Sequence, residues 1–289
     1  MGIAIVTGSN SGIGRATAAH LARHGHTVYA TMRDPGKAGK LLAATGQAGL
    51  DLRILALDVT SDDSVAGAIR SVLDAHGQVD VLVNNAGIAG NAVTEECPIA
   101  TYRAVMDANL YGAVRCIQAV LPAMRERRRG CIVNISSVVG RVAVLAQAPY
   151  VASKWALEGM CEALAHEVAA FGIRVAIVEP GITRSAIFAK NVDAPNQSGA
   201  YDGHYRRMFQ FYAAGIPRAT PAEEVAEVVL HAITTDQPTL RYAVSWGGPE
   251  MIAGRAAMTD EAWVALGAIA ADAAYYARFK EVFGLDIRH

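Results

Sequence analysis

The chain has 289 residues, of which 52% are hydrophobic and 18% are charged, and its formal net charge is -1. This length suits one large α/β domain or two small ones. The balanced charge gives no reason to expect a nucleic acid or an anionic membrane surface as a partner. The apolar start of the chain is too short for a signal sequence or a membrane span, so we expect a soluble, cytoplasmic protein.

The cysteines and histidines give no metal-binding pattern. The four cysteines are far apart in the chain and form no C-x-x-C pair, and the eight histidines include no H-E-x-x-H motif. We therefore expect reduced, mostly buried thiols and no metal site.

The first thirty residues have the order strand, glycine turn, helix. Residues 3–7 are a short apolar run, the next seven include Gly8, Gly12 and Gly14, and helix-forming residues continue over 15–23. Glycines allow a tight turn and a close approach of the backbone to a pyrophosphate, which then lies at the helix N-terminus. This order predicts a dinucleotide-binding segment.

Strands and helices continue to alternate along the chain. We predict further strands over 27–31, 53–57, 79–83, 130–135, 173–178 and 240–245, and helices over 61–76, 101–125, 150–171 and 221–235, with Ser61 and Thr220 as N-caps. The strands are continuous apolar runs, as in a parallel sheet covered on both faces. The predicted fold is therefore α/β, a single doubly wound Rossmann-type domain over residues 1–289, with helices on both faces of a central parallel β-sheet.

The pattern changes after residue 181. Residues 183–199 have the composition of a long loop with a short helix, within a substrate-loop region of about 182–215. The aromatic and methionine residues of 201–214 either line an apolar pocket or pack on the core, and both interpretations stay open. In a C-terminal helical extension over about 246–289, we predict one helix from 260 to 283.

Tyr150 and Lys154 are four residues apart on a predicted helix, so they project from one face about one turn apart. A free tyrosine titrates near ~10, and a fixed ammonium beside it favours the phenolate. Such a pair can donate or accept a proton near neutral pH. The pattern is short, and an ordinary exposed Tyr/Lys pair is the alternative.

Taken together, the motifs resemble those of the short-chain dehydrogenase/reductase family over roughly residues 3 to 245. They are Thr7-Gly8-x-x-x-Gly12-Ile13-Gly14, Asp58-Val59, Asn84-Asn85-Ala86-Gly87, Asn109, Ser137, Tyr150-x-x-x-Lys154 and Pro180-Gly181. Each motif alone is weak to moderate, but their order and their positions at predicted strand ends are specific to the family.

The resemblance implies a catalytic set. Tyr150 would be the general acid in carbonyl reduction and the base in alcohol oxidation. Ser137, rather than its neighbour Ser136, would polarise the substrate oxygen, and Lys154 would lower the tyrosine pKa and bind the nicotinamide ribose. Asn109 would support a proton relay through water to Lys154.

The resemblance also implies the cofactor contacts. Asp58 and Val59 would contact adenine, and Ile182, Thr183 and Ser185 would approach the nicotinamide. The full implied set is Gly8, Ser11, Gly12, Ile13, Gly14, Arg33, Asp58, Val59, Asn85, Ala86, Gly87, Tyr150, Lys154, Pro180, Gly181, Ile182, Thr183 and Ser185.

The end of the second predicted strand bears on cofactor choice. An acid there would accept from the ribose 2'-hydroxyl of NAD, but Met32 occupies the family's acidic position and Arg33 follows it. We interpret Asp34, which precedes a proline, as a turn residue. Because the guanidinium of Arg33 suits a phosphate, the expected cofactor is NADP(H), with NAD(H) possible.

We therefore expect an NADP(H)-dependent oxidoreductase that interconverts a ketone or aldehyde and an alcohol on a hydrophobic substrate. The alternatives are an NAD-dependent alcohol dehydrogenase of the same family and a non-catalytic nucleotide-binding sensor or scaffold. By family resemblance we also expect a homodimer or homotetramer formed through the two long helices at about 101–125 and 150–171.

Overall fold

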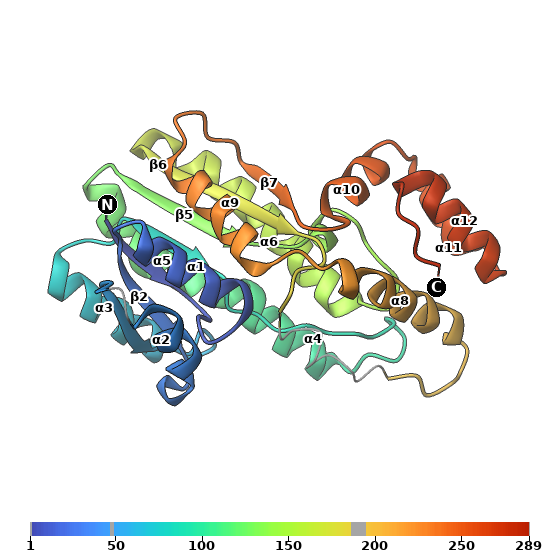
Figure 1. Ribbon diagram of the computed structural model, residues 1–289, viewed down its shortest axis with the longest axis horizontal. Coiled ribbons are helices and arrows are strands. Elements are labelled where there is room, and N and C mark those ends of the chain that lie inside the picture. Colours follow the sequence, from blue (N-terminus) through green and yellow to red (C-terminus); the bar gives the residue numbers. More distant parts are fainter. Residues whose placement is uncertain (1, 47–48, 186–194, 289) are drawn as a thin grey trace.

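Seven parallel strands form the centre of the molecule in the computed structural model, which describes residues 2–46, 49–185 and 195–288 (Figure 1). Their order across the sheet is β3-β2-β1-β4-β5-β6-β7. The strands are β1 (Ile3–Val6), β2 (Thr27–Met32), β3 (Leu52–Ala56), β4 (Val81–Asn84), β5 (Gly130–Ile135), β6 (Ile173–Pro180) and β7 (Arg241–Val244). The predicted doubly wound α/β fold is confirmed.

Helices cover both faces of this sheet because side chains alternate along each strand. Ile3 and Ile5 of β1 pack in the cluster shared with α3 (Asp62–His76), α5 (Gly112–Glu126) and α6 (Ala148–Val168). Ala4 and Val6 pack on the other face with α1 (Gly12–Arg23), α2 (Gly39–Thr45) and α9 (Ala222–Thr234). Within the described residues, no helix is both long and apolar enough to span a membrane.

The predicted helix over 101–125 is one continuous helical segment with an irregular turn inside it. It consists of α4 (Ile99–Met106), a π-helical turn η2 (Asp107–Tyr111) and α5. A π-turn adds a residue to the helix and changes the direction in which its side chains point, and such turns are frequent at functional sites. Asn109 lies in this turn and is 2% exposed.

Two predicted N-caps have different outcomes. The Ser61 hydroxyl accepts from the Ser64 amide at 3.2 Å and caps α3, as predicted. The prediction for Thr220 is wrong, because α9 begins at Ala222 with Pro221 at its N-cap position. The Thr220 hydroxyl instead accepts the backbone N–H of Trp246 at 3.1 Å, which joins this loop to the chain after β7.

The C-terminal part of the chain lies beyond the carboxyl ends of the strands, beside α8 (Asp202–Gly215), at the right of Figure 1. The single helix predicted over 260–283 is wrong: the chain forms α11 (Asp260–Gly267) and α12 (Asp272–Phe283) with a break between them. Three helices, α2, α8 and α10 (Gly248–Ala256), were not predicted, and α8 lies in the region expected to be a substrate loop. The short helix expected within 183–199 falls mostly on 186–194, outside the described residues.

Arg207 of α8 provides a physical reason for the break between α11 and α12. Its guanidinium donates to the carbonyls of Ile269 and Ala270 at 2.6 and 3.0 Å, and it pairs with Asp272 at 2.9 Å. It also lies over the ring of Tyr275, 4.3 Å from the centroid. These carbonyls are therefore bound by a side chain from another helix, and α8 is fixed to the C-terminal extension.

Replacing Arg207 with alanine is expected to lower the free energy of unfolding by about 2–3 kcal/mol, because Asp272 and two carbonyls lose a buried charged donor. Arg207 is 5% exposed. Arg206 pairs with the same Asp272 but is 59% exposed, so Arg206→Ala is the matched control and should cost less than about 1 kcal/mol. Urea unfolding of both variants checks this, and equal losses would contradict it.

Candidate active site

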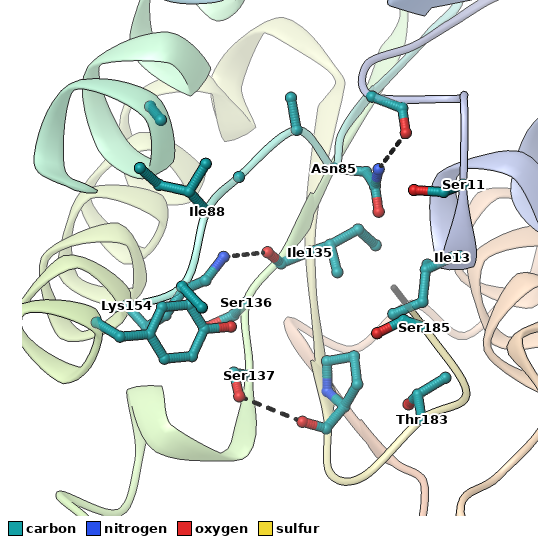
Figure 2. A pocket seen from close by; sticks show the side chains of 18 of the residues that line it. Ser11, Ile13, Asn85, Ile88, Ile135, Ser136, Ser137, Lys154, Thr183 and Ser185 are labelled. Carbon is teal, nitrogen blue, oxygen red and sulfur yellow. Dashed lines mark hydrogen bonds between the residues drawn. The ribbon is translucent and has the colours of Figure 1, made fainter. Parts of the chain in front are cut away.

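A cavity of about 510 Å³ opens at the carboxyl ends of the strands. The loops that follow β1 to β6, together with α6, α8 and α10, contribute to its walls. In Figure 2, Lys154, Ser136 and Ser137 lie on one side of it and Ser11, Ile13 and Ser185 on the other. Ligands bind at this edge in open parallel sheets, because the strand order changes direction there.

Most of the residues singled out in the sequence lie around this one cavity. The predicted residues that line it are Gly8, Ser11, Gly12, Ile13, Arg33, Asp58, Val59, Asn85, Ala86, Gly87, Ser137, Tyr150, Lys154, Pro180, Gly181, Ile182, Thr183 and Ser185. Gly14 and Asn109 are not part of the lining. Both lie behind it, Gly14 against Gly8 and Asn85, and Asn109 against Gly87.

The glycine turn requires glycine at three positions. Gly8 has a φ of 69° and Gly12 a φ of 53°, in the left-handed region that favours glycine. A Cβ on Gly14 would overlap the Asn85 side chain and lie 2.5 Å from the Gly8 carbonyl oxygen. The turn can therefore fold this tightly only with glycine at these places.

Asn85 joins the end of β4 to this turn. Its side-chain amide donates to the carbonyls of Thr7 and Gly8 at 2.8 and 3.2 Å, and its backbone N–H donates to the Thr7 hydroxyl at 2.9 Å. The Ala86 N–H donates to the same hydroxyl at 3.0 Å. The turn and the β4 end are thus held in a fixed relation at the cavity.

The N-terminus of α1 is suited to an anion. In the part of the chain that the structure describes, the Ser11 side chain makes no capping hydrogen bond, and no acidic residue is present in the first turn. The free N–H groups and the helix dipole point toward the cavity side of the turn. This donor set and the compact glycine turn fit a dinucleotide pyrophosphate.

The cavity end beside β2 and β3 carries charged groups. Met32 is buried at 3% exposure, and Arg33 and Lys37 both line the cavity. Asp34 also lines the cavity; its carboxylate accepts from the Gly36 N–H at 3.0 Å and pairs with Lys37 at 3.7 Å, so it is a turn residue as predicted. Lys37 was missed, although its place after the Asp-Pro-Gly turn could have indicated it.

Asp58 follows β3 in the same end of the cavity. Burial acts to raise the pKa of its carboxyl, but hydrogen bonds from the backbone and hydroxyl of Thr60 act against burial, and the pKa is lowered overall. The nearby charges of Arg33 and Arg115 act in the same direction. Asp58 is therefore an anionic acceptor at this end.

The two serines after β5 have different surroundings. The Ser137 hydroxyl lines the cavity and donates to the Pro180 carbonyl at 3.4 Å. The Ser136 hydroxyl is buried and has no hydrogen-bond partner among the described residues; it lies close to Gly140 and Glu158. Ser137 is the one that faces Tyr150, as the family resemblance implied.

Tyr150 and Lys154 lie on the first turns of α6. Burial raises the pKa of Tyr150 to about 12, against a lowering by its hydrogen bond with Ser137. Burial lowers the pKa of Lys154 to about 8. The Lys154 ammonium donates to the Ile135 carbonyl at 2.8 Å and lies 5.7 Å from the centroid of the Tyr150 ring. The expected lowering of the tyrosine pKa by Lys154 is thus not seen in the protein alone, because burial dominates.

Asn109 is held by its neighbours at the back of the cavity. Its amide donates to the Ile88 carbonyl and the Ser153 hydroxyl, both at 2.9 Å, and its carbonyl accepts from the Ile88 N–H at 2.8 Å. Ser153 in turn donates to the Tyr150 carbonyl at 2.8 Å. The π-turn is thereby connected to the turn of α6 that carries Tyr150 and Lys154, a connection through Ser153 that the sequence did not reveal.

The loop after β6 forms the opposite wall. A Cβ on Gly181 would overlap the Trp246 carbonyl, so this position requires close backbone packing. The Thr183 hydroxyl is 2.8 Å from that of Ser245, a residue with a φ of 73°. The segment at Thr183 is therefore held from the chain after β7 by a residue in a strained conformation.

The outer part of the cavity is mostly apolar. It is lined by Val138, Val139, Val144, Gln147, Ile182, Phe211, Tyr212 and Met251. Phe211 and Tyr212 face the cavity, whereas Tyr205 and Met208 are buried and pack with Val93. The 201–214 segment therefore lines the pocket with some of its residues and packs on the core with others. Met251 comes from the unpredicted helix α10, and no sequence pattern indicated it.

The site therefore combines a glycine turn and a helix N-terminus suited to a dinucleotide with two hydroxyls and a buried ammonium beside an apolar chamber. Such a set can bind a carbonyl oxygen and transfer a proton to it. These features define a dinucleotide-binding protein with an acid/base centre.

Comparison with known proteins agrees with this description. The family model for short chain dehydrogenase matches residues 2–196. Retinol dehydrogenase 8 of Bos taurus is 37% identical over 253 residues, which cover 82% of this chain and 79% of that protein. A short-chain dehydrogenase structure from Streptomyces avermitilis matches with a TM-score of 0.80 and 33% identity. The match covers 92% of this chain and 94% of that chain.

A further structure is that of a metagenomic short-chain oxidoreductase in complex with NADP. It has a TM-score of 0.68 and 30% identity, with 84% of this chain and 96% of that chain covered. The chain belongs to the short-chain dehydrogenase family. It is an oxidoreductase of CH–OH and C=O groups that uses a nicotinamide dinucleotide.

Proposed function

We propose that this enzyme reduces a lipophilic ketone or aldehyde to the alcohol, and catalyses the reverse oxidation, with NADP(H) as its preferred dinucleotide. The observation that carries the proposal is that Ser137, Tyr150 and Lys154 meet at one cavity whose outer walls are apolar. The retinol dehydrogenase relative, named for a lipophilic alcohol, supports the same substrate class.

Tyr150 is the proton donor in the proposed reduction. With a pKa of about 12, its hydroxyl stays protonated at neutral pH and can donate to an oxygen that becomes negative. The reduced nicotinamide, when bound, supplies the hydride. Ser137 holds the carbonyl oxygen through its hydroxyl, and the Lys154 ammonium stabilises the charge left on the tyrosine oxygen.

Lys154 and Asn109 complete the proposed catalytic set. Lys154 also binds the nicotinamide ribose, and its pKa of about 8 keeps it mainly an ammonium at pH 7. Asn109 supports the proton relay toward Lys154; its bond to Ser153, on the same helix turn, supports this role.

The proposed dinucleotide runs along the cavity from Asp58 and Val59 at its adenine end to Ile182, Thr183 and Ser185 at its nicotinamide end. The preference for NADP(H) rests on the residues after β2. Met32 offers no carboxylate for a ribose 2'-hydroxyl, and Arg33 and Lys37 are cations that line this end. The metagenomic relative in complex with NADP supports it.

The proposal includes assembly as a homodimer or homotetramer through the long helices. Ile99, Tyr111 and Trp155 support it, because these large side chains on α4, η2 and α6 are 63%, 51% and 50% exposed.

Changing Tyr150 to phenylalanine is expected to lower kcat at least about 100-fold on a ketone that the wild type reduces, because the proton donor is lost. NADPH affinity, followed by quenching of protein fluorescence, should change little. Tyr276→Phe is the control, since Tyr276 lies on α12 and does not line the cavity. Unchanged turnover in Tyr150→Phe would sink the catalytic assignment, and a wild type that binds NADPH without turning over any carbonyl would favour a sensor.

Steady-state kinetics with the two cofactors test the preference. We expect a higher kcat/KM with NADPH than with NADH, and Arg33→Gln should lower the NADPH value by about tenfold or more while changing the NADH value little. Arg70→Gln, an exposed position on α3, is the control. A higher kcat/KM with NADH in the wild type refutes the preference.

A further inference from the structure

Two carboxylates are buried behind the active site. Glu158 is 4% exposed and Glu179 is 2% exposed. Removing a carboxylate from water costs free energy that an ion pair only partly restores, and apolar side chains of similar volume are often as stabilising. A pair of buried glutamates therefore indicates a need other than stability.

Two arginines connect these carboxylates. The Arg241 guanidinium of β7 donates to Glu158 at 3.0 Å and lies 3.6 Å from Glu179. Arg141 donates to Glu179 at 3.1 Å. Arg241 also reaches Glu162, one turn further along α6, at 2.7 Å, and Glu162 is 65% exposed. The ion pairs thus run from the protein surface to the interior behind Lys154.

Three members of this network lie next to segments that carry active-site groups. Glu158 follows Lys154 by one turn on α6, so their side chains share a face. Arg141 follows the turn η3 (Val138–Gly140), which begins directly after Ser137. Glu179 directly precedes Pro180 at the end of β6. The network therefore joins α6, the serine segment and the β6 loop.

The Glu158 carboxylate also reaches the serine segment itself. A Cβ on Gly140 would lie 3.0 Å from Glu158 Cγ, 3.3 Å from its Oε1 and 2.8 Å from the Ser136 hydroxyl. Oε2 of Glu158 accepts from Arg241, whereas Oε1 accepts no hydrogen bond from the described residues and lies on the side of the serine segment.

The charges around Lys154 come from several elements. On α6 they are Tyr150, Glu158 and Cys161, and burial raises the pKa of Cys161 to about 12, so its thiol is neutral. From the elements packed on α6 come Glu179, Arg141 and Arg241, and the π-turn contributes Asp107, paired with Arg115 at 2.8 Å. Burial lowers the pKa of Lys154, and Cys161 and then Glu158 act against burial. Because the Cys161 thiol is neutral, Glu158 is the charged group of the two.

We infer that Glu158 is a positioning residue of the active site, whose carboxylate is the fixed counter-charge of Lys154 and holds α6 against the serine segment. Without this charge, the surroundings of Lys154 would keep the positive charges of Arg141 and Arg241 but would contain one carboxylate fewer. The ammonium would then be lost at lower pH, and Lys154 would stop binding the ribose and stabilising the tyrosine oxygen. This inference rests on the proposed function of Lys154.

The test is the pH dependence of kcat/KM and of NADPH affinity in Glu158→Gln. The amide keeps the shape of the side chain and can still accept from Arg241. The pH profile of kcat/KM should fall on its alkaline side near pH 8, where Lys154 loses its proton. In Glu158→Gln this alkaline limb should move down by about one pH unit, which makes kcat/KM at pH 8 about fivefold lower. NADPH affinity from fluorescence quenching should show the same shift, whereas a purely structural residue would move neither limb.

Glu162→Gln is the matched control, because Glu162 pairs with the same arginine but is 65% exposed. It should leave both pH profiles unchanged. Glu158→Asp keeps the charge and should return the limb to within about 0.3 pH units of the wild type. Glu158→Gln profiles that match those of Glu162→Gln would overturn the inference.

Two further outcomes are decisive. If Glu158→Gln does not fold, Glu158→Met takes its place in the same measurements, because it removes the charge and keeps the length of the side chain; an unchanged limb in that variant refutes the positioning role. If the wild type itself shows no turnover and no limb near pH 8, the proposed function fails. A wild-type limb that is insensitive to Glu158 refutes only the inference.

Discussion

The parallel pairing of β4, β5 and β6 is the constraint on which the active site depends. Asn84 pairs with Asn134 and Ile135 with Val178, so the three strands end at the same edge of the sheet. The chain must leave each strand there, and it does so through Asn85, Ser136 and Gly181. Groups from distant parts of the sequence therefore meet without any long loop to position them.

The polar groups of the site are placed in a largely apolar interior, and this decides their chemistry. Burial holds Tyr150 protonated and makes Lys154 easier to deprotonate. The pKa of the tyrosine is therefore above its value in water, and that of the lysine is below it. The lysine needs both a hydrogen-bond acceptor and a counter-charge to remain an ammonium there. The Ile135 carbonyl is the hydrogen-bond acceptor, and Glu158 is the counter-charge that we infer.

The sequence was sufficient where local physics decides the structure. The glycine turn, the apolar strands and the Ser61 cap are each determined by residues close in the chain, and all were predicted. The break after α11 was not, because the side chain that binds the carbonyls there, Arg207, is more than sixty residues away from them. Thr220 similarly has its hydroxyl bound by Trp246 rather than by its own helix.

The same distinction applies to the site. Family motifs indicated the residues at the strand ends, but Met251 and Ser153 reach the site through packing and hydrogen bonds between helices, which no spacing in the sequence reveals. The pKa of Tyr150 was expected to be lowered by its neighbour, and it is raised instead. A charge four residues away can be read from a sequence, whereas the depth of burial that outweighs it cannot.

The central claim is that the cavity brings together a nicotinamide dinucleotide and an apolar carbonyl for hydride transfer. The most direct measurement uses NADPH deuterated at both C4 positions of the nicotinamide and a panel of lipophilic ketones and aldehydes, with mass spectrometry of the alcohols formed. The account predicts one deuterium on the carbinol carbon of at least one product, and none when either the protein or NADPH is left out. Alcohol formed without that label, or no alcohol from any member of the panel, would contradict it.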